Sequence, residues 1–598
     1  MFDNKKKYYF VLMFLILQML QVSFASAQTT ITSDHLTLRG DPLNKKGWTH
    51  FSYVNPQAPK GGTVTLHATG TYDNFHRYAL RGSCAAGYEY FYDTLMTGSG
   101  DESDVLYPLI ASRVEYAADY SFVIFDINTN AKDQDGNAIT AEDAAFSFNI
   151  IFEKGVPQFR SYYAGVTVKA LSGNRVRFDL DRDRTKEKIM ALAGTTVFPK
   201  RYWQDHDFSE PLITPPLGTG AYRVKDYKMG QYVVLERVKN YWAADLPVNK
   251  GQYNFDTIRY DYYRDTNVAF EAFKAGEYDF RQENSASNWA TAYNGKLFEN
   301  GTIVREEIEH EVAQGMTSLV FNIQRPIFSD RRIRAALNYF FDFEWMNKNL
   351  FYNQYKRARS YFQNTRYEAK GIPSDDELRV LEPLRGKIPN EVFTTEYNPP
   401  VSTGDGYIRN NAREAMKLFK EAGWELKKGK LVNVTTGEPF EFELLIYDNT
   451  IERYAIPYQR NLERYGITMR IRNIDVSQYI NRLRSRDFDL LANGSPAFQA
   501  PSSELMVVWH SQFIDSTWNT PGVTDDAVDY LTEQIAANQE DDAKLLTLGR
   551  ALDRVLTLNI YCVPQWYLNK FRLAYIDKFD KPNVRPKYDV GFNTWWVK

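Results

Sequence analysis

The sequence has 598 residues, of which 43% are hydrophobic and 15% aromatic, and its formal net charge is -3 at pH 7. This length exceeds what a single hydrophobic core usually supports, so we expect two or more domains. Lys and Arg are spread along the chain and balanced by Asp and Glu, which argues against a nucleic-acid-binding protein or one that docks on an anionic membrane.

The N-terminus has the three parts of a cleavable signal peptide. Lys5, Lys6 and Lys7 precede an apolar run from Tyr8 to Leu20, and an Ala-Ser-Ala triplet ends at Ala27. The apolar run is too short to cross a bilayer comfortably, and no Cys is present at the cleavage site to carry a lipid. We therefore expect cleavage near Ala27 and Gln28 and, in a Gram-negative bacterium, a location in the periplasm.

The first elements after this segment have clear start signals. Residues 50–62 read HFSYVNPQAPKGG, in which Pro and Gly predict a turn, and residues 64–68 then alternate as in a half-buried strand. Thr140 and Asp143 resemble a capping box. They predict an amphipathic helix whose buried face carries Ala144, Phe148 and Ile151.

The most distinctive stretch is a glycine-led hairpin. Gly218-Thr219-Gly220 permits a tight turn, two runs rich in Tyr and Val follow, and Met229-Gly230 between them marks the reversal. The chain continues through Asn240-Tyr241-Trp242. A helix then runs from Phe270 to a C-cap glycine at Gly276 and passes into a strand.

This ordered set closely resembles the family 5 extracellular solute-binding proteins, which are the receptors of peptide and nickel ABC importers. The segments HFSYVNPQAPKGG and FDFEWMNKNLFYNQY and the aromatic C-terminus from Phe592 to Trp596 are similar to the YejA-type branch of that family. The resemblance implies an α/β, two-lobed periplasmic binding protein fold (type II, class C) with an extra small domain in the first lobe.

The resemblance also implies a division of the chain. Domain I, the base of the first lobe, would comprise residues 28–72, 212–308 and 556–598. Domain II, the small domain, would comprise residues 73–211, and domain III, the second lobe, residues 309–555. Residues 561–567 are expected to rejoin the first lobe.

The second half of the chain alternates between strand and helix patterns. A strand over residues 318–323 precedes a helix that Ser329 or Asp330 can cap. Tyr361 to Thr403 is rich in Pro, charge and polar residues and is expected to be a long surface excursion. A helix follows from Asn410 to a C-cap glycine at Gly423.

Five further segments read β-α-β-α-β. This alternation predicts a mostly parallel sheet with right-handed crossovers. The segments are residues 440–447, 456–464, 467–471, a helix from 476, and 488–491.

Enzyme and metal signatures are missing from the sequence. It contains no HExxH, CxxC, P-loop or GxSxG motif, and its seven His residues are dispersed. We therefore predict neither catalysis nor a metal or cofactor. Cys84 and Cys562 are the only cysteines, and either a disulfide or two free thiols is compatible with their positions.

In the family that this sequence resembles, two lobes close around an extended ligand, and backbone groups at strand edges pair with the peptide main chain. The implied function is a monomeric periplasmic receptor that captures peptides or peptide conjugates. It would deliver them to an inner-membrane permease that is driven by a cytoplasmic ATPase on another chain. An oligosaccharide receptor of the same fold, suggested by the Tyr and Trp content, and a secreted hydrolase are the alternatives.

One loop departs from the family pattern. Many peptide receptors of the family carry a Trp and an Asp just after the strand equivalent to residues 488–491, and the Asp holds the ligand's amino group. Ala492 to Pro501 contains neither residue, and a buried ammonium without a carboxylate is costly. The hypothesis is a ligand with a blocked N-terminus, such as a murein-derived or formylated peptide, or one whose end lies elsewhere, with Asp448 or Glu452 as a substitute carboxylate.

The candidate ligand contacts lie on this loop and at the ends of neighbouring strands, with two more in the first lobe. Each also fits a structural role: Asn322 in a turn, Trp509 in a core, and Arg453 as a solvated charge at a helix start. The full set is Asn493, Gly494, Ser495, Phe498, Trp509, Tyr447, Arg453, Asn322, Arg81 and Tyr90.

Overall fold

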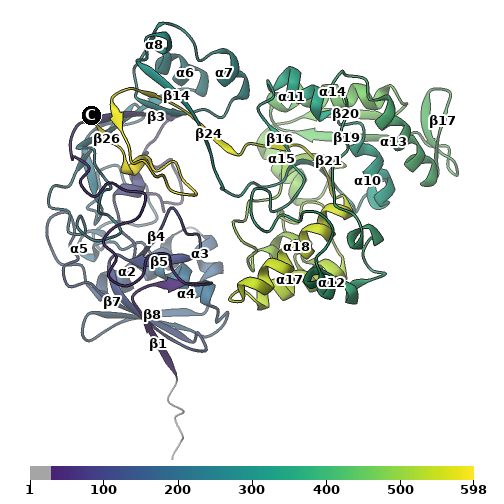
Figure 1. Cartoon of the computed structure of the whole chain (residues 1–598). Helices are drawn as coiled ribbons and strands as arrows, with labels where there is room; N and C mark the ends of the chain where they lie inside the picture. The colour runs from purple at the N-terminus through teal and green to yellow at the C-terminus, as the bar shows by residue number, and fades with distance from the viewer. Residues whose placement is uncertain (1–28, 156) are drawn as a thin grey trace, which may run out of the picture.

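The alternating strand and helix patterns of the sequence fold into two lobes that lie side by side (Figure 1). The computed structural model describes residues 29–155 and 157–598, so the predicted signal peptide lies outside the described residues. Within the described chain, no helix is long and apolar enough to span a membrane. The chain leaves the first lobe after β14 (Ile303–Glu309) and returns in β24 (Lys570–Ile576), which pairs antiparallel with β14.

The lower end of the first lobe in Figure 1 is an antiparallel sheet of five strands. The helix α2 (Ala141–Lys154) packs on this sheet and buries the predicted residues Ala144, Phe148 and Ile151. The Asp143 carboxylate accepts a hydrogen bond from the backbone N–H of Thr140 at 2.8 Å, as expected of a capping box. Two helices, α3 (Pro157–Tyr162) and α4 (Lys186–Ala193), complete this part. The strands, in sheet order, are β1 (Thr30–Ser33), β6 (Ala111–Ala117), β7 (Phe122–Ile127), β9 (Arg175–Leu180) and β8 (Val166–Leu171).

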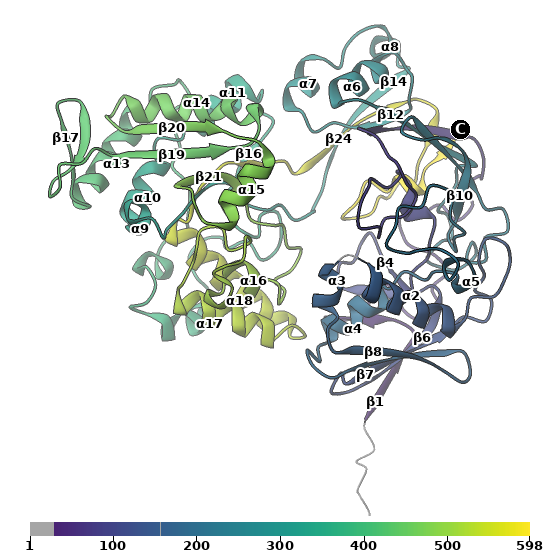
Figure 2. The same cartoon turned by 180° about the vertical axis from the view of Figure 1, so that it is seen from behind.

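The predicted hairpin is confirmed and belongs to a second sheet of the first lobe, visible from behind in Figure 2. The reversal lies at Gly230, whose φ is 71°. The predicted first strand joins the far edge of this sheet in parallel. The strand order is β10 (Tyr222–Lys228), β11 (Tyr232–Arg237), β12 (Thr257–Tyr263) and β3 (Thr63–Thr69).

The upper end of the first lobe is a sheet of three strands, β13 (Phe280–Gln282), β24 and β14, covered by three short helices. The predicted helix is α6 (Thr266–Lys274), and Gly276 follows it with a φ of 78°, so the predicted end is confirmed. The other two helices are α7 (Ala286–Thr291) and α8 (Lys296–Glu299). A further small sheet, β2 (Leu36–Thr37), β5 (Val105–Pro108) and β4 (Met96–Gly98), lies in the middle of this lobe.

The two glycines that lead the hairpin are needed for a different reason from the one predicted. Neither has a positive φ. Instead, the backbone N–H groups of Thr219 and Gly220 both donate to the Phe91 carbonyl at 2.9 Å. A Cβ on Gly218 would lie 2.0 Å from that oxygen, and one on Gly220 would lie 2.4 Å from the Tyr90 carbonyl. Close approach of two backbone segments therefore selects glycine here.

The second lobe is built on a mixed sheet. Only β20, β19 and β21 run parallel to one another, whereas β15 and β22 are antiparallel to their neighbours. The prediction of a mostly parallel sheet is therefore right for three of its five strands. The other two enter from distant parts of the chain, where local alternation says nothing of direction. The strands are β20 (Thr468–Asn473), β19 (Glu441–Ile446), β21 (Leu490–Gly494), β15 (Thr317–Phe321) and β22 (Cys562–Pro564).

Helices pack on this sheet as the sequence predicts. Asp330, not Ser329, caps α10, because its carboxylate accepts from the backbone N–H of Arg332 at 2.8 Å. The helices are α9 (Pro326–Ser329), α10 (Arg331–Asn338), α11 (Phe343–Leu350), α13 (Arg409–Glu421), α14 (Asn449–Glu463), α15 (Val476–Arg484) and α16 (Leu505–Trp509), and a hairpin of β17 (Trp424–Lys427) and β18 (Lys430–Asn433) projects outward.

The expected surface excursion over residues 361–403 is instead part of a core. It contains α12 (Asp375–Leu381) and packs against α17 (Asp526–Ala537) and α18 (Asp542–Asn559). Phe362, Tyr367 and Val392 are buried there. The prediction was wrong because the apolar residues are irregularly spaced among charges and prolines, so no periodicity marks the face that these helices cover.

The chain returns to the first lobe later than expected. Residues 561–567 stay in the second lobe, because β22 pairs with β15, and β23 (Trp566–Tyr567) pairs with β16 (Lys356–Arg357). In the first lobe, β1 joins the five-stranded sheet, and Phe75 and Trp203 share a core with Val64. Cys84 packs against the core of the first lobe, Cys562 lies in β22 of the second lobe, and both are free thiols.

We expect Gly220→Ala to destabilise the protein by roughly 1–3 kcal/mol, because the added methyl group meets backbone atoms that cannot move aside. Gly98→Ala is the matched control, since its Cβ would meet nothing closer than 4.0 Å. The urea-unfolding midpoints of both variants, followed by circular dichroism, test the difference. Equal midpoints would contradict the steric account.

Candidate ligand-binding cleft

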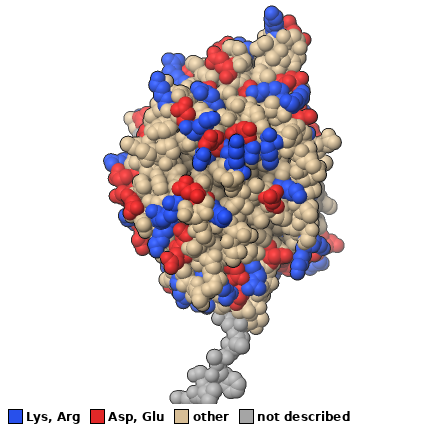
Figure 3. All heavy atoms as spheres, turned by 90° about the vertical axis from the view of Figure 1, so that its left-hand side faces the viewer, with Lys and Arg blue, Asp and Glu red and all other residues tan. Residues whose placement is uncertain are grey.

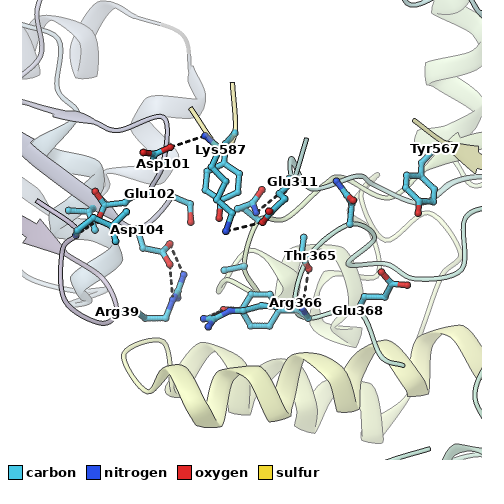
Figure 4. Close-up of a pocket in the computed structure, with 18 of the residues that line it drawn as sticks. Arg39, Asp101, Glu102, Asp104, Glu311, Thr365, Arg366, Glu368, Tyr567 and Lys587 are labelled. Carbon is cyan, nitrogen blue, oxygen red and sulfur yellow. Dashed lines mark hydrogen bonds and ion pairs between the residues drawn. The ribbon is translucent and has the colours of Figure 1, made fainter. Parts of the chain in front are cut away.

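A cavity of about 890 Å³ lies between the two lobes (Figure 4). On the first-lobe side it is lined by two loops, residues 39–43 and 101–105, and by Lys587 and Tyr588 near the C-terminus. On the second-lobe side it is lined by the segment that the sequence assigned to a surface excursion. These second-lobe residues are Lys356, Arg359, Asn364, Thr365, Arg366, Tyr367, Glu368, Lys370, Gln499, Ala500 and Tyr567, and Glu311 lies between the lobes.

Charged residues dominate the lining and are divided between the lobes. Four of six carboxylates come from the first lobe, and four of six cations come from the second. We call these two groups the acidic wall and the basic wall. The acidic wall is Asp41, Asp101, Glu102 and Asp104, and the basic wall is Lys356, Arg359, Arg366 and Lys370.

Neutral donors hold two carboxylates of the acidic wall in place. Glu102 accepts from the Leu43 backbone N–H at 2.7 Å and from the Tyr107 hydroxyl at 2.5 Å. Asp101 accepts from the Ser52 hydroxyl at 3.1 Å and from the Lys587 backbone N–H at 2.8 Å. Neither carboxylate forms an ion pair within residues 29–155 and 157–598. Both negative charges are therefore oriented without being neutralised.

Burial raises the pKa of Tyr107 to about 12, and its hydrogen bond to Glu102 adds to this effect. The hydroxyl therefore stays protonated at neutral pH and remains a donor. It anchors the Glu102 carboxylate without contributing a charge.

The two cations on the first-lobe side are already engaged. Arg39 donates to both oxygens of Asp104, at 2.7 and 3.1 Å. It also donates to the backbone oxygen and side-chain Oε1 of Gln539 in the second lobe, both at 3.1 Å. The Lys587 ammonium lies 2.9 Å from a Glu311 carboxylate oxygen. Figure 4 shows this Lys587–Glu311 pair between the two walls.

The side chains of the basic wall are less firmly held than those of the acidic wall. Arg359 donates to Glu368 at 2.8 Å, and Arg366 pairs with Asp542. The Lys370 ammonium is 3.8 Å from Glu368 with 65% of its side chain exposed. Lys356 is exposed, and in the described part of the chain it has no ion-pair partner. Two lysines thus present solvated, adjustable charges to the cavity.

Asp553 on α18 fixes the segment that carries the basic wall. Its carboxylate accepts from the Ser360 hydroxyl at 2.7 Å and from the backbone N–H groups of Tyr361 and Ala369 at 2.8 and 2.9 Å. Burial raises the pKa of Asp553 to about 7, and these hydrogen bonds offset only part of that effect. One carboxylate therefore ties both ends of the wall segment to a buried helix.

The predicted loop contacts lie beside the cavity and do not line it. Asn493 donates to the Thr520 hydroxyl at 3.1 Å, and the Ser495 backbone N–H donates to the Met316 carbonyl at 3.1 Å. Gly494 pairs with Thr317 in the sheet, and Phe498 packs against the core of α17 and α18. The next two residues of the same loop, Gln499 and Ala500, do line the cavity.

Three other predicted contacts have structural roles. Trp509 is 2% exposed and packs in the core beside Tyr361. Asn322 is also 2% exposed, and its amide donates to the Arg486 and Phe488 carbonyls at 3.1 and 2.9 Å. Tyr90 donates to the Asn593 side chain at 2.7 Å. Trp509 is therefore a core residue. Asn322 also accepts from the Gln324 backbone N–H at 3.2 Å, as expected of a residue in a turn.

The remaining predicted contacts are exposed and lie away from the cavity lining. Tyr447 packs edge-on against Tyr479, Arg453 donates to the Leu350 carbonyl at 2.9 Å, and Arg81 pairs with Glu210 at 2.5 Å. The two substitute carboxylates have other partners: Asp448 caps α14, and Glu452 accepts from Asn473 at 3.2 Å.

Sequence reasoning missed both walls of the cavity. The acidic wall had one local signal, the acidic residues of the run Asp101-Glu102-Ser103-Asp104, and residues 356–370 had only a high density of charge. Solvated surface segments show the same patterns. Among the residues that the structure describes, no group of three or more His, Cys, Asp or Glu could hold a metal ion.

The sequence of this chain matches a known protein family. The profile described as "Bacterial extracellular solute-binding proteins, family 5 Middle" matches residues 105–515. The chain belongs to this family of solute-binding proteins. The "Uncharacterized protein YejA" of Escherichia coli (strain K12) is 53% identical over 570 residues, which cover 95% of this chain and 94% of the relative.

A second relative and a solved structure agree with this assignment. The "Probable peptide-binding protein YejA" of Agrobacterium fabrum is 37% identical, with 96% of this chain and 95% of the relative covered. The oligopeptide-binding protein AppA from Bacillus subtilis, in complex with a nonapeptide, is 19% identical with a TM-score of 0.63. That comparison covers 91% of this chain and 100% of AppA. The predicted family, its YejA-type resemblance and the two-lobed α/β fold are confirmed.

We expect Asp553→Asn to change how stability depends on pH. Because burial raises the folded-state pKa from 3.8 to about 7, the folded protein binds this proton more tightly than the unfolded chain does. The stabilising contribution is therefore full below about pH 4 and lost as the pH rises through about 7.

Relative to the Asp553→Asn variant, the wild-type free energy of unfolding should fall between about pH 4 and about pH 8. Urea unfolding of both proteins across this range measures the difference. A difference that does not vary with pH would show that Asp553 does not titrate in this way.

Proposed function

We propose that this chain is the substrate-binding component of an ABC importer and captures peptides or peptide conjugates between its two lobes. The observation that carries the proposal is the charged cavity between the lobes, with carboxylates on one wall and cations on the other. Peptides present both charges within one molecule. Membership of the solute-binding family supports the same function.

The cavity favours a peptide over an oligosaccharide. Sugars are usually bound on exposed aromatic faces, which is why the Tyr and Trp content suggested an oligosaccharide receptor. In this cavity, however, twelve of the 22 lining residues are charged. Of the three lining tyrosines, Tyr367 is only 2% exposed. A murein-derived peptide remains within the proposal, because such peptides carry free carboxylates that suit the basic wall. We further propose a receptor role without catalysis.

We propose the periplasm as the site of action, with an inner-membrane permease and a cytoplasmic ATPase as partners and the receptor acting as a monomer. The signal-peptide pattern of residues 1–27 supports this location. Acidic and basic side chains intermingle on the outer face of the first lobe in Figure 3, as is usual for a surface in contact with water.

We propose a domain division close to the predicted one but moved at its ends. The small domain would combine β1 with the sheet and helices between β6 and α4. The second lobe would extend from β15 to β23, because these strands pair with one another and not with the first lobe.

The proposal is tested by native mass spectrometry of the protein purified from its own periplasm, followed by denaturation to identify the bound molecules. We expect peptides or peptide conjugates, because closure of two lobes buries a ligand and slows its release. The same protein after unfolding, washing and refolding is the ligand-free control. Recovery of sugars alone from the native sample would overturn the peptide assignment.

A further inference from the structure

We propose that the cavity binds its ligand in one orientation, with a free amino group against Asp101 and Glu102 and a carboxylate against Lys356 and Lys370. This inference rests on the proposed peptide function and adds the chemistry and direction of binding. It assigns the cationic end of the ligand to the first lobe. It also replaces the blocked N-terminus suggested by the loop over residues 492–501 with a free one.

The acidic wall suits an ammonium because hydrogen bonds orient Asp101 and Glu102, and neither has an ion-pair partner in the described part of the chain. The donors to Asp101 and Glu102 are a backbone N–H and a hydroxyl in each case, with the Asn44 amide as a third donor to Glu102 at 3.3 Å. These neutral groups orient the carboxylates and leave the negative charge available. The neighbouring Asp104 differs, because Arg39 already binds both of its oxygens.

The basic wall fits carboxylates whose position varies. Lys356 and Lys370 have long side chains and exposed ammonium groups, and the nearest carboxylate to Lys370 is 3.8 Å away. A lysine is a flexible point charge that can reach a carboxylate without strict geometry. This wall would therefore accept the C-terminus of peptides of different lengths, or an acidic side chain.

The two walls belong to different lobes, so only a ligand with both charges interacts fully with each lobe. Lys587 and Glu311 already neutralise one another between the walls, which leaves the outer charges to the ligand. The inferred ligand class is a peptide with a free α-amino group and at least one free carboxylate. Acylation of the amine or amidation of the carboxylate would each remove one of the two interactions.

The test presents ligand-free protein with an equimolar mixture of one tripeptide library in four forms. These are free at both ends, N-acetylated, C-amidated, and blocked at both ends. Native mass spectrometry reads which masses are retained. We expect the free form to be retained about 10- to 100-fold more than either singly blocked form, because blocking removes a hydrogen bond between charged groups.

Variants that remove a charge test which end of the peptide each wall binds. Glu102→Gln should reduce the penalty for N-acetylation and leave the penalty for C-amidation intact. The double variant Lys356→Gln/Lys370→Gln should do the reverse. Glu299→Gln and Lys417→Gln are matched controls, because both residues are exposed and neither lines the cavity.

Equal retention of all four forms by the wild type would overturn the orientation while leaving a peptide receptor in place. An acetylation penalty that Glu102→Gln leaves unchanged would also overturn it. Retention of no tripeptide, together with sugars recovered from the native protein, would overturn both this inference and the proposed function.

Discussion

Two paired strands carry the chain between the lobes, and this crossing limits how the lobes can move. β14 and β24 pair from Ile303 with Ile576 to Glu309 with Lys570. The next residue, His310, still donates from its backbone to the Asn569 carbonyl at 3.0 Å. The backbone is therefore tied together up to the edge of the first lobe. Rotation of the second lobe must come from the few residues between this ladder and the next strands, at 311–316 and 568–569.

A second set of contacts joins the lobes away from this crossing. The turn between α17 and α18 meets the small domain, where Tyr120 donates to Glu540 at 2.5 Å, and it also meets Arg39, whose guanidinium binds Gln539. Ser503 donates to Glu187 at 2.7 Å nearby. These contacts are polar, so water can take their place when the two surfaces separate. The side of the cleft that faces the small domain is therefore the side that can open, whereas the paired strands hold the other.

The parts of this structure that were predictable are those with local causes. Gly230 in the hairpin reversal, Gly276 after α6 and the Thr140–Asp143 cap are each decided by a few neighbouring residues, and all three were found. The cavity has no local cause, because Glu102, Lys356 and Lys587 meet only after the chain crosses between the lobes twice. Of the loop over residues 492–501, which the resemblance singles out, Gln499 and Ala500 line the cavity. The earlier residues Asn493–Ser495 and Phe498 do not line it, because sheet pairing and core packing engage them.

The division of charge between the lobes makes closure the step at which ligands are distinguished. While the cleft is open, water solvates Glu102 and Lys356, and an uncompensated charge there costs little. Closure removes that water, and a charge without an opposite partner is then destabilised by the loss of its hydration. A ligand that supplies the opposite charge on each side removes both penalties, whereas one that lacks either charge leaves a penalty in the closed state. Selectivity therefore comes from the difference between open and closed states and does not require a pocket shaped for one side chain.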